Sequence, residues 1–284
     1  MVGQQFTIAQ ALAHGRELCV KAGSDTAALD TQLLLMHVMG CDRTYLYTWP
    51  DRPLTAEQSV AFQNLLEQRA QGMPIAHVIG MREFWSLPLK VNNSTLIPRP
   101  DTEVLVEQAL ARVQQANADV LELGTGTGAI ALALASERPH WHIRAVDRAP
   151  DAVILAEENR RRLGFDHVRI ETSDWFSAIE PTARFHLIVS NPPYIAHDDE
   201  HLTQGDLRFE PHSALVAEQG GYADLAYIIQ TAWGFLHPDG WLMLEHGASQ
   251  SPKVREVFQE LGYAHIYTAK DYANLDRVTC GQRP

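Results

Sequence analysis

The chain has 284 residues, of which 45% are hydrophobic, and its formal net charge is −12. This length predicts about two domains with substantial cores, and the share of hydrophobic residues excludes an intrinsically disordered protein. Residues 1–7 lack the features of a signal peptide, and no apolar run approaches the roughly 20 residues of a membrane span, so we expect a cytoplasmic protein without a membrane anchor.

The first part of the chain has the pattern of a small helical bundle. Apolar positions recur at helical spacing in residues 8–21, 26–39 and 55–71. Asp25 and Thr55 stand where helix N-caps are expected. We therefore expect a helical bundle over residues 1–73, which either docks a substrate or braces the rest of the chain.

A linker and a second domain follow the bundle. Residues 75–91 are rich in strand-forming residues interrupted by a glycine and a proline, and they predict a β-hairpin. We assign this hairpin to a linker over residues 74–92. A helix predicted over residues 101–115 then enters a second domain, which we expect to span residues 93–284.

Strands and helices alternate from residue 120 onward. The predicted strands end near Leu123, Val146, Thr172, Val189 and Glu245. Such alternation is typical of an α/β fold in which helices cover both faces of a parallel sheet. Ligands in these folds bind at the carboxyl ends of the strands, so side chains that follow the strands are the candidates for a functional site.

A glycine-rich segment follows the first of these strands. Glu122 and Leu123 end the strand, and the next five residues are Gly124, Thr125, Gly126, Thr127 and Gly128. Glycines here let the backbone approach a ligand closely, which predicts a site for a nucleoside-type cofactor. The spacing, with Asp147 about 20 residues on, also satisfies the looser dinucleotide fingerprint. The glycines alone therefore leave a nicotinamide or flavin dinucleotide open.

Two further strand ends contribute acids to the same edge of the sheet. The Asp147 carboxylate could accept hydrogen bonds from both ribose hydroxyls, although it could also cap the helix that follows. Asp174 could accept a proton from an adenine amine while Trp175 or Phe176 covers the ring. A turn followed by a core aromatic is the alternative interpretation of this second pair.

The sequence Asn191-Pro192-Pro193-Tyr194 is the most specific signal. Two prolines fix φ and hold the preceding carbonyl groups in one direction. The Asn191 side-chain oxygen and the Pro192 carbonyl then offer two acceptors to a planar NH₂ group, and Tyr194 offers a ring for that group to lie against. An amide or aromatic amine nitrogen attacks a methyl group only when it is held in line and polarised in this way. We call these four residues the clamp.

The glycine segment and the clamp together resemble the class I methyltransferases that methylate planar NH₂ groups with S-adenosylmethionine. Within that group the chain resembles the PrmC/HemK family, the glutamine methyltransferases of peptide chain release factors. The match runs from about residue 70 to the end, and three further segments carry it, Glu83-Phe84-Trp85, Leu96-Ile97-Pro98-Arg99-Pro100-Asp101-Thr102-Glu103 and Arg208-Phe209-Glu210-Pro211.

This resemblance implies a Rossmann-like, mostly parallel seven-stranded sheet and methyl transfer to the glutamine of a release factor's Gly-Gly-Gln motif. It implies that S-adenosylmethionine is held by residues 124–128, Asp147, Asp174, Trp175 and Asn191, and the glutamine amide by Asn191, Pro192, Pro193 and Tyr194. The residues expected to act in catalysis are Asn191, Pro192 and Tyr194. Glu122 stands where the family commonly has aspartate, and either carboxylate could receive the cofactor's ammonium group.

Other substrates and roles stay open at this point. Nucleic-acid amino-group methyltransferases carry a similar clamp, but a net charge of −12 counts against a polyanionic substrate. The run Arg160-Arg161-Arg162 is interpreted as a solvated helix end. The ribosomal-protein glutamine methyltransferases are a closely related alternative, although their segment after Pro98-Arg99 usually differs. An adaptor that only binds the cofactor would need no clamp.

Two further expectations concern metals and mobility. The three cysteines are scattered, and the 13 histidines form no local metal-binding motif, so we expect neither a disulfide framework nor a metal site. Residues 195–213 are rich in acids and histidines and poor in apolar residues, which predicts a mobile lid over the active site.

Overall fold

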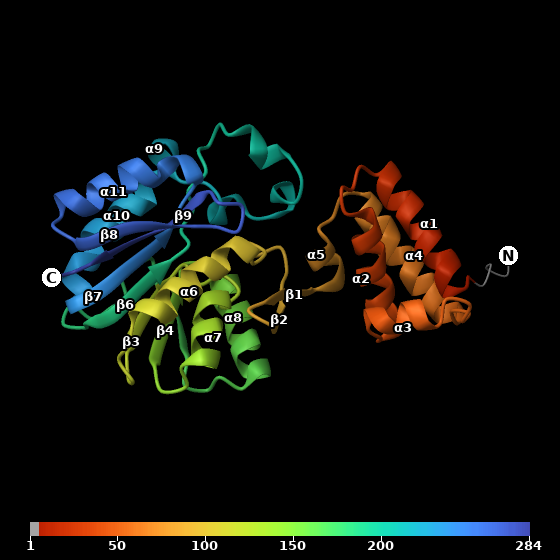
Figure 1. Cartoon of the computed structure of the whole chain (residues 1–284), viewed down its shortest axis with the longest axis horizontal. Coiled ribbons are helices and arrows are strands. Elements are labelled where there is room, and N and C mark those ends of the chain that lie inside the picture. The colour runs from red at the N-terminus through yellow and green to blue at the C-terminus, as the bar shows by residue number, and fades with distance from the viewer. Residues whose placement is uncertain (1–5) are drawn as a thin grey trace. The chain divides into compact units, whose positions relative to one another are not determined.

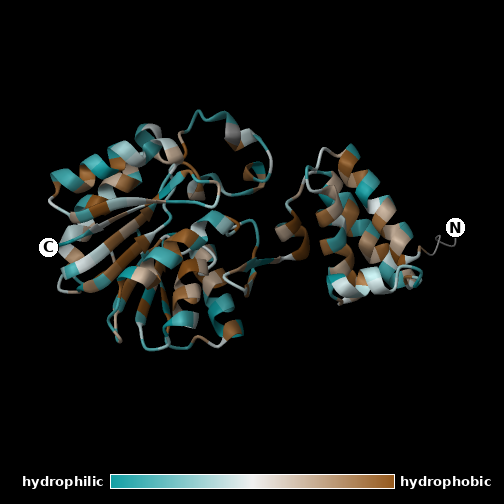
Figure 2. Cartoon of the chain, in the orientation of Figure 1, coloured by the Kyte–Doolittle hydropathy of each residue, from teal (hydrophilic) through white to brown (hydrophobic). Residues whose placement is uncertain are grey.

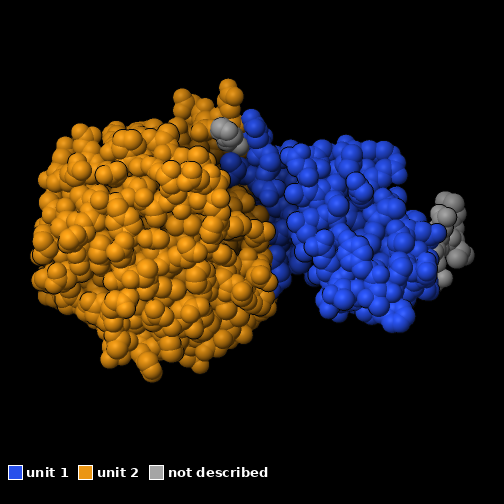
Figure 3. Space-filling view, in the orientation of Figure 1, with its two compact units in different colours: residues 1–81, 203–209 blue, residues 82–202, 210–284 orange. Residues whose placement is uncertain are grey.

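The computed structural model describes residues 6–284, so the first five residues of the expected bundle lie outside the described part. The chain divides into two compact units (Figure 3). The first unit comprises Met1–Met81 and Thr203–Phe209, and the second comprises Arg82–Leu202 and Glu210–Pro284. The division falls at residue 81, inside the expected linker, and a short segment from the second half of the chain belongs to the first unit.

The first unit is a helical bundle, and Figure 1 shows its elements α1 (Ile8–Lys21), α2 (Ala27–Met39), α3 (Arg43–Thr48), α4 (Ala56–Ala70) and α5 (Ile75–Ile79). The side chains of Thr7 and Thr55 begin α1 and α4 as capping boxes, in which side chain and backbone bond reciprocally. Leu34, Leu35 and Phe62 lie in the buried core of the bundle. The three helices expected from the apolar spacing are confirmed.

Three features of this unit differ from the sequence-based expectation. Residues 75–79 form α5 and not a strand, because Gly80 ends a turn of helix in the left-handed conformation and Val78 is buried in the bundle core. Asp25 does not cap α2. The N-cap is Thr26, whose hydroxyl donates to Asp30 at 2.8 Å and makes no cap bond. The short helix α3 was not expected from the sequence.

The hairpin is shorter than expected, with strands β1 (Met81–Phe84) and β2 (Leu87–Lys90). The two turn residues, Trp85 and Ser86, both have positive φ, as a two-residue turn of type I′ requires. The Trp85 indole N–H donates to Glu137 at 2.9 Å, and its backbone N–H donates to Glu103 at 2.9 Å. These bonds fix the turn to helices of the second unit.

The second unit contains a seven-stranded sheet in the order β5-β4-β3-β6-β7-β9-β8, and only β9 runs antiparallel to its neighbours. The strands are β3 (Asp119–Leu123), β4 (His142–Asp147), β5 (Arg169–Thr172), β6 (Phe185–Ser190), β7 (Leu236–Glu245), β8 (Ala264–Lys270) and β9 (Asp276–Gln282). The α/β fold with a mostly parallel sheet is confirmed, and the five predicted strand ends agree within one residue. The last two strands were not located in the sequence.

Helices pack on both faces of this sheet: α6 (Glu103–Arg112), α7 (Ala129–Glu137), α8 (Pro150–Leu163), α9 (Glu218–Gly221), α10 (Ala223–Ala232) and α11 (Ser251–Glu260). The expected helix 101–115 is α6, preceded by the 3₁₀ turn η1 (Pro100–Thr102). Arg160 and Arg161 share the Glu157 carboxylate in the last turns of α8, at 2.7 Å each, so the arginine run is a helix end as expected.

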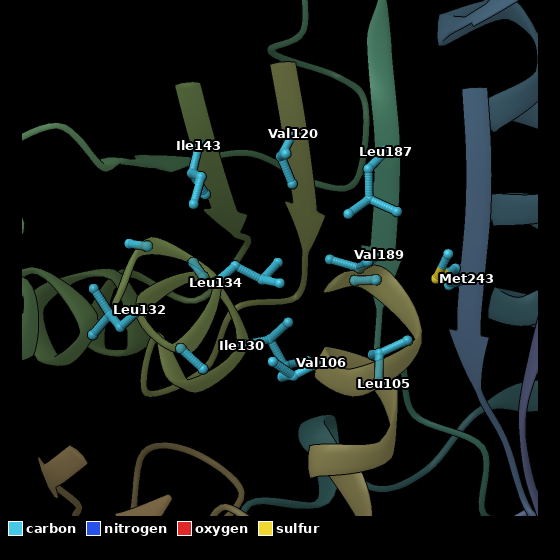
Figure 4. Close-up of a cluster of buried hydrophobic side chains, with 14 of the residues drawn as sticks. Leu105, Val106, Val120, Ile130, Leu132, Leu134, Ile143, Leu187, Val189 and Met243 are labelled. Atoms are coloured by element: carbon cyan, nitrogen blue, oxygen red, sulfur yellow. The ribbon is translucent and has the colours of Figure 1, made fainter. Parts of the chain in front are cut away.

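Two buried clusters lie on opposite faces of the sheet. Figure 4 shows the first, in which Val120 and Leu187 of the strands meet Leu105 and Ile130 of α6 and α7. The second cluster packs the other face of the strands against α10 and α11. In Figure 2 the central strands are accordingly hydrophobic. Among residues 6–284 no helix combines the length and the apolar character that crossing a membrane requires.

Candidate functional site

A cleft opens at the carboxyl ends of β3, β4 and β6, within the second unit. Its position is the one where ligands bind in open α/β sheets. The predicted residues that line the cleft are Glu122, Gly124, Thr125, Gly126, Thr127, Asp147, Asp174, Trp175, Asn191 and Pro193. Three predicted residues, Gly128, Pro192 and Tyr194, are not among the lining residues. The sequence-predicted candidates thus converge on one place, although they come from four strand ends.

The glycine loop follows β3 and turns into α7. Gly124, Gly126 and Gly128 have φ of +70°, +55° and +84°, a region that side chains strongly disfavour. The Thr125 N–H donates to the Val146 carbonyl at 2.9 Å, which ties the loop to the neighbouring strand. Gly128 begins α7, and a Cβ there would lie 3.1 Å from Leu132. Gly128 is therefore needed for helix packing and not for lining the cleft.

Glu122 is buried beneath this loop. Its Oε2 accepts from the Thr125 hydroxyl at 2.7 Å and from the Ala131 N–H at 3.0 Å. Burial raises the pKa of Glu122 to about 8, against the opposing effect of these two bonds, and the charge of Asp147 raises it further. The carboxyl group is consequently protonated at pH 7 unless a cation approaches it.

Asp147 bonds to the glycine loop and to the residue that precedes α8, which has no side-chain cap bond, so its role as a ribose ligand stays a prediction. Its Oδ2 accepts from the Gly126 N–H at 2.9 Å, and its Oδ1 accepts from the Ala149 N–H at 2.9 Å, next to the start of α8. Each carboxylate oxygen has two lone pairs, so both can accept a second hydrogen bond from a ligand. The side chain holds the loop in place and faces the cleft at once.

Trp175 and Asp174 form the wall of the cleft after β5. Trp175 has φ of +49°, an unusual backbone conformation for a large residue and of the kind that clusters at functional sites. A Cβ on Gly124 would lie 3.5 Å from its ring, so the indole lies beside the glycine loop. Asp174 is exposed, and its N–H donates to Ser177 at 3.1 Å.

The clamp follows β6, whose end is fixed by a bond from the Ser190 hydroxyl to the Leu123 carbonyl at 2.7 Å. The Asn191 Nδ2 donates to the Thr102 hydroxyl oxygen at 3.3 Å. This bond leaves Oδ1 as an acceptor, and Asn191 is one of the residues that line the cleft. Tyr194 is partly buried and directs its hydroxyl to Glu245 Oε1 at 3.3 Å.

Glu245, the last residue of β7, is a buried acid that sequence reasoning did not assign to the site. Tyr194 bonds directly to this carboxyl group, and Thr102, the hydrogen-bond partner of Asn191, lowers its pKa. Burial raises its pKa to about 7, opposed by Thr102, Arg277 and Tyr194. Among the described residues Oε2 has no hydrogen-bond partner. Only the end of a predicted strand pointed to this position.

The segment 94–99 forms another wall of the cleft and was assigned no role from the sequence. Buried Glu210 fixes it, accepting from the Ile97 N–H at 2.9 Å and pairing with Arg99 at 2.7 Å. The Thr95 hydroxyl oxygen is buried at this wall and has no partner within residues 6–284. Both Thr95 and the Arg99–Glu210 pair lie in or beside segments that carried the family resemblance, so the resemblance was the signal that could have found them.

The expected lid region contains the 3₁₀ turns η2 (Glu200–Thr203), η3 (Leu207–Phe209) and η4 (His212–Ala214). Its last turn contributes Ser213 and Ala214 to the cleft, and Arg148 donates to the Ser213 carbonyl at 3.2 Å. The end of this segment is thus a wall of the site. Its mobility stays a prediction.

Comparison with known proteins gives matches over nearly the whole chain. Residues 10–80 match the family model of the PrmC N-terminal domain, and residues 100–221 match that of the methyltransferase small domain. The release factor glutamine methyltransferase of Shewanella oneidensis is 53% identical over 99% of this chain and 98% of its own, and that of Escherichia coli K12 is 52% identical over 91% and 93%. A methyltransferase structure from Pyrococcus furiosus shares the fold, with TM-score 0.54, 17% identity and coverage of 78% and 98%.

Proposed function

Since the chain belongs to the release factor glutamine methyltransferases, we propose that it transfers a methyl group from S-adenosylmethionine to the side-chain amide nitrogen of the glutamine in the Gly-Gly-Gln motif of class I peptide chain release factors. Near-complete coverage by relatives of this name supports the activity. The observation that carries the chemistry is the Asn191 amide, whose Nδ2 is bonded to Thr102 so that Oδ1 remains an acceptor.

The residues of the cleft fit this cofactor. Three acidic side chains, Glu122, Asp147 and Asp174, suit a ligand that carries an ammonium group, a ribose diol and an adenine amine. The unpartnered Thr95 hydroxyl and the positive-φ glycine loop leave polar atoms and backbone for a ligand. S-adenosylmethionine supplies an electrophilic methyl group on a sulfonium. We assign its ammonium to Glu122, whose carboxyl would ionise beside a cation, and its ribose to Asp147.

The clamp supplies the chemistry at the glutamine. Asn191 Oδ1 and the Pro192 carbonyl accept the two N–H groups of the amide, which fixes the plane of the amide and adds electron density at nitrogen. As the nitrogen–carbon bond forms, the sulfur–carbon bond breaks and the sulfur becomes a neutral thioether. The methylated nitrogen is then strongly acidic and loses its proton, so no side-chain base is needed before the transfer.

Tyr194 and Glu245 support this clamp from behind. The Tyr194 hydroxyl bonds to buried Glu245, and Thr102 interacts with both Glu245 and Asn191. We assign Glu245 the role of a positioning residue that keeps the side chains of Asn191 and Tyr194 in their relative positions. The first unit would dock the body of the release factor, and such a substrate places the enzyme in the cytoplasm, without direct contact to nucleic acid or membrane.

Mass spectrometry tests the activity. The purified protein is incubated with S-adenosylmethionine and unmethylated release factor, and separately with bare nucleic acid. We expect a gain of one methyl on the Gly-Gly-Gln peptide, and its loss in the Asn191→Ala variant. Label in nucleic acid alone would overturn the substrate, and no transfer to either, with cofactor still bound, would indicate an adaptor.

A further inference from the structure

A row of titratable side chains crosses four adjacent strands at the amino edge of the sheet, opposite to the cleft. Asp119 opens β3 and pairs in register with His142, which opens β4. Because Val120 pairs with Leu187, Asp119 stands beside His186 of β6. His237 follows Leu236, the β7 partner of Phe185. Residues far apart in the sequence therefore stand side by side on one face.

Three members of this row come within ligand distance of one another. One ligand atom each of Asp119, His186 and His237 lies within 4.8 Å of the other two. The Asp119 Oδ2 lies 3.6 Å from His186 Nδ1, and the rings of His186 and His237 are 4.4 Å apart between centroids. The three side chains are only partly buried, so an ion could reach them from solvent.

We propose that Asp119, His186 and His237 form a binding site for a divalent transition-metal ion of the zinc class. Two imidazoles and one carboxylate are a usual protein ligand set for tetrahedral Zn²⁺, with an open fourth position for water. At bond lengths of about 2.0–2.1 Å, neighbouring ligand atoms of such an ion lie about 3.3 Å apart, close to the 3.6 Å between Asp119 and His186. Mg²⁺ and Ca²⁺ prefer oxygen ligands and would be rejected.

A fourth side chain orients the site, and one bond opposes it. His142 Nδ1 lies 3.2 Å from Asp119 Oδ1, so it fixes the carboxylate from the side away from His186, as an outer-shell partner does in metal sites. The His186 Nδ1 accepts from the Asp119 backbone N–H at 3.0 Å. This bond shows that Nδ1 carries the lone pair that a metal needs, but the ion must compete for it, which limits the affinity.

Calorimetric titration tests the proposal. Untagged, metal-free protein is titrated with ZnCl₂ near pH 7 in the presence of excess Mg²⁺. We expect one equivalent to bind, and Co²⁺ in its place to give the intense visible absorption of a tetrahedral site. His186→Gln and His237→Gln should each weaken this binding at least about tenfold. His167→Gln, which changes an exposed histidine outside the row, should leave it unchanged.

Two outcomes would overturn the site. The absence of a one-equivalent isotherm would do so directly. Retention of the isotherm in both variants would place the ion on histidines elsewhere. Thermal unfolding and near-UV circular dichroism show whether the metal-free variants are folded like the parent protein. If they are, the loss of Zn²⁺ binding is due to the loss of a metal ligand. If they are not, Asp119→Asn, which keeps the side-chain shape, replaces them in the same titration.

Discussion

The two edges of the sheet in the second unit gather polar side chains in different ways. At the carboxyl edge the backbone leaves the strands in irregular paths, through the positive-φ glycines and the clamp, and bonds such as those of Glu122 and Asp147 fix the side chains. At the amino edge Asp119 and His186 follow the register of β3 and β6, and His237 lies where the pairing of β6 with β7 is irregular. The side chains of the reaction site are thus fixed by many hydrogen bonds to loops and neighbouring strands, whereas the amino-edge side chains are brought together mainly by the order of the strands.

The largest effect on activity should follow from removing the Asn191 side chain at the carboxyl edge of the sheet. Asn191→Ala removes an acceptor that fixes the reacting amide, so we expect kcat/KM for the release factor to fall about 100- to 1,000-fold. The Kd for the cofactor, measured by calorimetry, should change far less. Asn117→Ala, at an exposed position ahead of β3, is the matched control and should keep full activity. An Asn191→Ala enzyme with nearly normal kcat/KM would refute the assignment of the clamp.

A smaller effect should follow from removing the support behind the clamp. Glu245→Ala takes away the acceptor of the Tyr194 hydroxyl, and the misplaced clamp should lower kcat about 10- to 100-fold. The KM for the release factor should stay close to its original value, because docking of the substrate body does not use Glu245. Glu245→Gln keeps an oxygen for Tyr194 and should restore most of kcat. A loss of kcat that Gln does not rescue would indicate a different role for the carboxyl group.

The sequence predicted which residues lie at the carboxyl edge of the sheet because the features that place them there are local. Positive-φ glycines, paired prolines and an acid at the end of a strand each impose a backbone conformation within a few residues, so Gly124, Asp147 and Asn191 were placed correctly in one cleft. The alternation of strands and helices was visible for the same reason. Roles in binding and catalysis stay predictions, since they depend on ligands.

What the sequence did not predict depends on contacts between distant residues. Glu245 joins the clamp through Tyr194, 51 positions away in the chain. The amino-edge row depends on strand order and register, which no short spacing records, so histidines without a local motif were predicted to bind no metal. The helix α5 was mistaken for a strand because burial of Val78 in the bundle outweighed a weak local preference.

The stability of the protein should depend on pH, because the carboxyl edge of the sheet buries acidic side chains and burial disfavours their charged forms. Folding raises the pKa of Glu245 from 4.5 to about 7, so the folded protein holds a proton that the unfolded chain releases. The free energy of unfolding should therefore fall as pH rises from about 4.5 to 7, by up to about 1.4 kcal/mol per pH unit from this group, and then level off.

Glu245→Gln isolates this contribution. The variant has no proton to lose, so its stability relative to the parent protein should rise over the same pH window, as measured by chemical denaturation at several pH values. Charge repulsion from the rest of the chain acts on both proteins and cancels in the difference. A difference that does not vary with pH would mean that Glu245 titrates normally in the folded protein.

The smallest effect should come from the amino edge. One equivalent of Zn²⁺ at Asp119, His186 and His237 should change the rate of methyl transfer less than about twofold, because His186 and Ser190 lie four residue steps apart along β6, a distance of about 13 Å. Drawing the Asp119 and His186 ligand atoms together requires a shift of only a few tenths of an ångström, which the partly exposed side chains absorb without moving the strands. The rate is measured with and without the ion in the same preparation. A large change in the rate would mean that metal binding shifts β6 and thereby moves the clamp, and the two edges would then act as one site.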